Sequence, residues 1–130
     1  MSDLEFSTND GSVLSFTVTR RQQDEIEFDV AVTARSFSGV APASTFVTGS
    51  PAVLFNDMAS SWDGWKDQKK WNDLEGRVEF SATSDLTGHI ELAVTLRGQD
   101  FDTNLHVVLN FEAGQLNGMA KAVSLLLGDR

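Results

Sequence analysis

The chain has 130 residues, 41% of them hydrophobic, and no cysteine, which predicts one domain over residues 1–130 and excludes disulfides, thiolate metal sites and cysteine nucleophiles. Its formal net charge of −9 disfavours nucleic acid as a partner, because proteins hold phosphates with Lys and Arg, and favours a basic protein. The acidic start "MSDLEFSTND" lacks the features of a signal peptide, and no apolar run is long enough for a membrane helix, so we expect a cytoplasmic protein.

The first third of the chain predicts strands. "SVLSFTVTR" and "EIEFDVAVTA" alternate apolar and polar residues, as strands with one solvated face do. Asp10-Gly11 predicts a hairpin turn after a short strand at 4–6. A further strand is expected in "SFSGVAPASTFVT", where Pro42 indicates an edge position because proline cannot donate to a ladder.

A helical period follows. Ser50 is the expected N-cap, Pro51 the first helical residue and Gly64 the stop. This helix would place Trp62 on its buried face and Trp65 just beyond its end.

Alternation then returns in three segments, which predict an antiparallel meander over 78–82, 90–96 and 105–111. A final helical stripe runs from Leu116 to Leu127 and ends at Gly128, and Gly118 inside it is expected to allow close packing on the sheet. The predicted fold class is α+β, with a single antiparallel meander-type sheet of about six or seven strands and two helices packed on one face.

The sequence contains no catalytic motif. His89 and His106 are expected on the solvated face of the sheet, where they could meet near carboxylates and bind a metal or move protons. Two isolated histidines are more often plain surface residues, and we expect no catalytic residue, metal or cofactor.

Acidic residues form one candidate binding surface. Glu25, Glu27 and Asp29 share one face of a predicted strand and could form a docking strip for a basic partner. The alternative is a solvated strand face relieved by neighbouring Arg or Lys side chains.

All three tryptophans lie between residues 60 and 76. They could be core residues, a partner surface or a ligand platform. Trp71, among charged residues, is the one that we expect to be exposed, and exposed aromatics are typical binding anchors.

Three segments carry a resemblance: "WDGWKDQKKWNDLEG", "EFSATSDLTGHIEL" and "NFEAGQLNGMAKAV". Together they resemble an uncharacterised bacterial family, a domain of unknown function. The matching residues are Trp62, Gly64, Trp65, Trp71, Leu74, Glu75, Gly76, Gly88, His89, Glu112, Gly114 and Gln115. The order of elements is also similar to that of immunity proteins paired with wall-associated contact-dependent toxins, which are small, often acidic and bind a toxin domain.

The resemblance and the acidity together imply a non-enzymatic protein-binding protein, an immunity protein that neutralises a basic, nuclease-like toxin. The candidate partner-binding residues are Glu25, Glu27, Asp29 and Trp71. One alternative is a small-ligand module, for example for carbohydrate, that uses the tryptophan segment. Another is a hydrolase that uses His89 and His106. The oligomeric state and the strand order stay open.

Overall fold

The structure, a computed structural model, describes residues 2–130 and contains the same element order twice: four strands followed by a helix. The first half comprises β1 (Leu4–Ser7), β2 (Val13–Arg21), β3 (Ile26–Thr33), β4 (Ser38–Ser44) and α1 (Ala52–Ser60). The second half comprises β5 (Lys69–Asn72), β6 (Val78–Ser84), β7 (His89–Arg97), β8 (Asn104–Glu112) and, after a short 3₁₀ turn at Ala113–Gln115, α2 (Leu116–Leu127).

The strands form two sheets, which corrects the predicted single sheet. One has the order β1-β2-β3-β4 and the other β5-β6-β7-β8, and every pair is antiparallel. The α+β class and the antiparallel meanders are confirmed. The number of sheets differs because each sheet has an apolar face, and the two faces bury one another.

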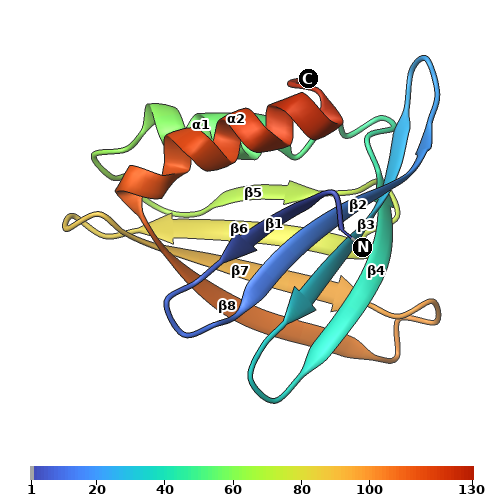
Figure 1. Cartoon of the computed structure of the whole chain (residues 1–130), viewed down its shortest axis with the longest axis horizontal. Coiled ribbons are helices and arrows are strands. Elements are labelled where there is room, and N and C mark those ends of the chain that lie inside the picture. Colours follow the sequence, from blue (N-terminus) through green and yellow to red (C-terminus); the bar gives the residue numbers. More distant parts are fainter. Residues whose placement is uncertain (1) are drawn as a thin grey trace.

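The two helices also lie differently from the prediction. They pack on each other and reach β1 and β5, the first strands of the two sheets. Figure 1 shows both helices along one side of the molecule, with the first sheet in front of the second. They therefore close one side of a two-sheet sandwich instead of covering a sheet face. Gly118 in α2 has no atom near the position of a Cβ, so its expected role in close packing is wrong.

A cluster of six aromatic rings joins the parts of the core. Phe16 in β2 lies 6.1 Å from Phe80 in β6, measured between ring centroids, so the two sheets touch through these rings. Phe55 of α1 lies 6.1 Å from Phe80 and 6.0 Å from Phe6. Trp71 in β5 lies 5.7 Å from Phe80 and completes the cluster with Phe28. Both sheets and α1 thus share one core.

Several local predictions are confirmed. Gly11 turns between β1 and β2 with φ 87°, and Pro42 lies in β4 at the edge of its sheet. α2 ends at Gly128. The start of α1 differs from the prediction: its N-cap is Pro51, and the buried hydroxyl of Ser50, one residue earlier, accepts the Ala52 N–H at 3.0 Å. No helix among residues 2–130 is both long and apolar enough to cross a membrane.

Candidate functional site

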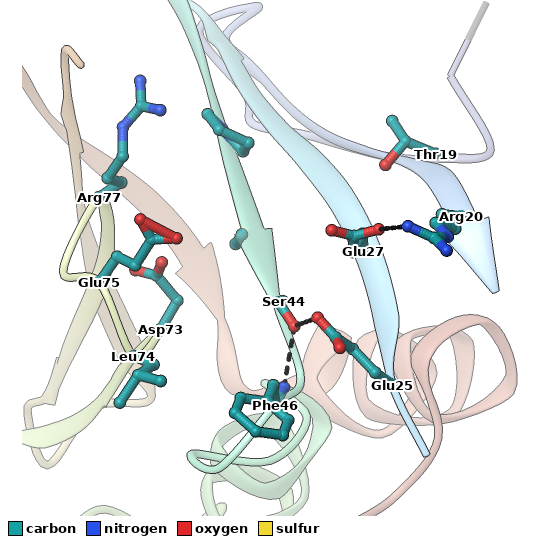
Figure 2. A pocket seen from close by; sticks show the side chains of 12 residues that line it. Thr19, Arg20, Glu25, Glu27, Ser44, Phe46, Asp73, Leu74, Glu75 and Arg77 are labelled. Carbon is teal, nitrogen blue, oxygen red and sulfur yellow. Dashed lines mark hydrogen bonds and ion pairs between the residues drawn. The ribbon is translucent and has the colours of Figure 1, made fainter. Parts of the chain in front are cut away.

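A groove of about 410 Å³ lies where the end of the first sheet meets the first turn of the second. We call it the acidic groove. The end of β2, the start of β3 and the end of β4 form one wall, and the β5–β6 turn forms the other (Figure 2). Its lining residues are Thr19, Arg20, Glu25, Glu27, Pro42, Ala43, Ser44, Phe46, Asp73, Leu74, Glu75 and Arg77.

Carboxylates outnumber cations in this groove. Four lining residues are acidic, whereas only Arg20 and Arg77 are basic. Arg20 lies 3.8 Å from the Glu27 carboxylate, an exposed and therefore weak ion pair. The Nε of Arg77 donates to the carbonyl oxygen of Arg97, at the end of β7, at 3.1 Å, and this bond holds the Arg77 side chain in place. The groove therefore has an acidic surplus.

Glu25 and Ser44 hold the first wall together. The Ser44 hydroxyl donates to the Glu25 carboxylate at 2.6 Å and accepts the Phe46 N–H at 2.9 Å, as drawn in Figure 2. These bonds tie the β2–β3 turn to the residues that follow β4. Because the hydroxyl both donates and accepts, its position is fixed, and the wall is formed before any ligand arrives.

Asp73 builds the opposite wall. It is buried, its carboxylate accepts the Val78 N–H at 2.9 Å, and its carbonyl oxygen accepts the Gly76 N–H. These bonds close the β5–β6 turn. The closed turn leaves the next two residues, Leu74 and Glu75, exposed beside the groove.

Apolar side chains stand at the rim. Phe46 is 52% exposed and Leu74 is 54% exposed, although both are large enough to favour burial. Phe46 belongs to a tight turn in which Gly49 donates to the Thr45 carbonyl oxygen. Val47 in that turn has φ 66°, a left-handed conformation that is costly for a β-branched residue. A strained turn that exposes aromatic and aliphatic side chains is typical of a binding surface.

The predicted acidic strip is only partly gathered at this site. Glu25 and Glu27 line the groove. Asp29 lies further along β3, opposite Thr17 of β2 and Pro42 of β4, and is not a lining residue. Its neighbours Phe28 and Val30 are buried, so Asp29 shares the outer face of the strand with Glu27, as the alternation predicted.

Two of the three tryptophans, Trp71 and Trp62, contradict their predicted exposure. Trp71 is 6% exposed and its indole N–H donates to the Gly49 carbonyl oxygen, so it is a core residue and cannot be an exposed anchor. Trp62 lies beyond the end of α1 and is 66% exposed, because the helix ends at Ser60 and not at Gly64. Trp65 packs against the core and donates its indole N–H to the Ala82 carbonyl oxygen. The Lys69 ammonium lies over its ring. The three rings therefore do not form a common platform.

The two histidines do not meet. His89 pairs with Glu112 and contacts Asn110, whereas His106 pairs with Thr95. Residues 106 and 112 are about 20 Å apart along an extended strand. Within residues 2–130 no group of three His, Asp or Glu side chains is placed to hold a metal ion.

Two carboxylates outside the groove have shifted pKa values. The His89 N–H and the Thr87 hydroxyl hold the pKa of Asp85 below 3.8, and the Thr8 hydroxyl and the Ser12 N–H do the same for the pKa of Asp10. Both lie in hairpin turns, so these shifts reflect turn structure.

Comparison with known families identifies the family of this chain. A model of a family of unknown function, DUF6228, matches residues 5–130. The chain belongs to the DUF6228 family. The match begins within β1 and extends past α2, so it includes both sheets and every residue of the acidic groove. The predicted resemblance to a family of unknown function is confirmed at this level. A search of curated proteins found no match.

In this DUF6228 chain, the predicted site residues included Glu25 and Glu27 and no other lining residue of the groove. Leu74, Glu75 and Arg77 come from a turn whose first strand, β5, was not predicted. Phe46 was assigned to a strand, yet it follows β4. The available signal was Asp73 three residues before Gly76, a turn-forming pair that precedes the alternating β6 segment.

Proposed function

We propose that this protein is a non-enzymatic protein-binding protein that takes a basic segment of its partner into the acidic groove. The observation that carries the proposal is the combination in one groove of four carboxylates and two exposed apolar side chains, Phe46 and Leu74. Carboxylates steer and orient a cationic partner, whereas the apolar side chains supply buried contact area.

The charge of the whole molecule supports a basic partner. The net charge of −9 gives an attractive field for a cationic protein, and such fields raise association rates by orders of magnitude at low salt. Hydrogen bonds within the protein hold Glu25 and Asp73, whereas Glu27 has only the weak, exposed ion pair with Arg20. Glu27 and Glu75 are therefore the side chains that we expect to engage the partner.

A toxin-neutralising immunity protein is the specific form of this proposal. A small acidic protein that covers a basic, nuclease-like domain needs a preformed acidic surface and no catalytic group of its own. The acidic groove meets the first requirement, because hydrogen bonds within the protein fix both of its walls.

The experiment that tests the proposal is affinity recovery of the tagged protein from its native cells, with mass spectrometry of what is retained. We expect one basic protein at near-equal amounts. The recovered partner is then measured against Glu27→Lys/Glu75→Lys, which should weaken binding at least tenfold and flatten its salt dependence.

The matched control is Glu5→Lys/Glu91→Lys, which changes the net charge equally at exposed positions in β1 and β7. This variant should keep most of the affinity. Equal losses of affinity in the two variants would show that only the overall charge matters. An unchanged affinity of Glu27→Lys/Glu75→Lys would show that the partner binds outside the groove.

A further inference from the structure

The two sheets have four edges: β1, β4, β5 and β8. An edge strand presents unpaired N–H and C=O groups, which invite another strand unless something protects them. The helices protect two edges, because α2 packs against β1 and α1 packs against β5. In Figure 1 both helices lie along this side of the molecule, away from β8.

Proline protects the edge at β4. The Thr45 N–H donates to the Ile26 carbonyl oxygen, so odd-numbered residues of this segment turn their backbone groups toward β3. Pro42 is therefore one of the residues whose backbone faces outward. It has no N–H, so it interrupts the ladder that a further strand would need.

The fourth edge, β8, has no such protection. The Ala113 N–H donates to the Gly88 carbonyl oxygen and the Gly98 N–H donates to the Thr103 carbonyl oxygen, so odd-numbered residues face β7. The backbone groups of His106, Val108 and Asn110 consequently face outward, and none of them has a backbone partner on that side in the part of the chain that the structure describes.

The side chains of this edge suit self-pairing. Residues 104–111, "NLHVVLNF", include no charge, no glycine and no proline, in a chain whose net charge is −9. Val108, 45% exposed, lies midway between two exposed polar residues, His106 and Asn110. In an antiparallel pair of two such strands centred on Val108, each His106 would face Asn110 of the other copy.

We propose that a second copy of this chain pairs along β8, antiparallel and about a two-fold axis at Val108, so that the β5–β8 sheets of two molecules become one continuous sheet. An interface of this kind uses the same patch on both subunits, which an uncharged strand with a polar residue two positions to either side of Val108 provides. The ladder ends at Asn110, because the next outward N–H, that of Glu112, already donates to the Gln115 side chain at 2.9 Å.

The test is sedimentation of the purified full chain over a range of concentrations. We expect a monomer–dimer equilibrium that Val108→Lys abolishes, because it sets two like charges opposite each other at the axis. Val40→Lys is the matched control: Val40 is exposed on β4, the edge that Pro42 interrupts, and its variant should dimerise as the wild type does.

A second variant, Val108→Cys, tests the same pairing without adding a charge. The chain has no cysteine, so Val108→Cys introduces a single thiol. Directly paired residues have Cα atoms roughly 5.5 Å apart, which a disulfide can span. Oxidation should give a covalent dimer with Val108→Cys and not with Val40→Cys. A monomer at every concentration, or a dimer that survives Val108→Lys, would overturn the proposal.

Discussion

Two tryptophans of one segment have opposite surroundings. Trp71 contacts Phe28 and Phe80 and donates its N–H to a carbonyl oxygen, whereas Trp62 is mostly exposed. A buried indole contributes through both its apolar area and its satisfied N–H group, so its removal leaves a cavity and an unpaired carbonyl.

We expect Trp71→Ala to lower the free energy of unfolding by about 3–5 kcal/mol, the usual cost of truncating a large buried aromatic residue. Trp62→Ala, the matched control, should change it by less than about 0.5 kcal/mol. Urea denaturation followed by far-UV circular dichroism measures both. Similar values for the two variants would contradict the burial of Trp71 and the exposure of Trp62.

The sequence could not assign these tryptophans correctly, for a local reason. Trp71 has charged neighbours at 69, 70 and 73, which favour exposure, yet a strand turns alternate residues to opposite faces and buries Trp71 alone. Trp62 fits the helical period of Leu54 and Met58, but α1 ends two residues before it. The outcome for Trp71 was decided by a short strand, and the outcome for Trp62 by the position at which α1 ends.

At the scale of elements, the β6–β7 turn depends on one carboxylate. Asp85 accepts the N–H groups of Thr87 and His89 at 2.9 and 3.0 Å and the Thr87 hydroxyl at 2.7 Å. These bonds favour the ionised form, which is why the pKa of Asp85 lies below 3.8 in the folded protein.

A group with a lowered pKa stabilises the fold above its unfolded pKa, and the contribution disappears as the pH falls through the folded value. We therefore expect Asp85→Ala to lower the melting temperature at neutral pH, with the difference from wild type shrinking below about pH 3.8. Calorimetry from pH 7 to pH 2 measures this. Asp24→Ala, at an exposed position, is the control, and a difference that grows in acid would contradict the assignment.

Most elements could be predicted from the spacing of apolar residues, but the arrangement of the strands in two sheets could not. Alternation placed β2, β3, β6, β7 and β8 because each turns one apolar face inward over many residues. β5 has only four residues, too few for an alternating pattern to be recognised, yet it is the first strand of the second sheet. Pairing across the core depends on contacts between distant residues, and a period along the chain carries no information about them.

At the scale of the molecule, one aromatic cluster serves both halves. Phe16, Phe80 and Phe55 come from the first sheet, the second sheet and α1, and each contacts another of the three. Neither sheet can lose its partner without exposing these rings to water, which couples the unfolding of the two halves.

We expect thermal unfolding to be a single transition, with coincident curves from far-UV circular dichroism and from tryptophan fluorescence. Phe80→Leu should lower the melting temperature and leave the transition single, because it weakens the shared core without separating the halves. Two separate steps, one for each sheet, would contradict this and also the predicted single domain.

The acidic groove was predictable in its charge and not in its shape. Glu25 and Glu27 could be selected from the sequence because strand alternation places them on one outer face. Leu74 and Glu75 reach the same groove only because the second sheet packs on the first. A site that forms between two halves of a chain needs the packing of the whole molecule before its members can be known.

The repeated order of four strands and a helix has a consequence for synthesis on the ribosome. Every strand of the first sheet is made by residue 44, whereas β7, which covers part of its apolar face, ends at residue 97. At translation rates of about 5–20 residues per second, the first sheet waits roughly 3–10 seconds before that cover is complete. The nascent chain therefore passes through a half-built state that invites chaperone binding, and protease digestion of stalled chains ending near β6 should find it accessible.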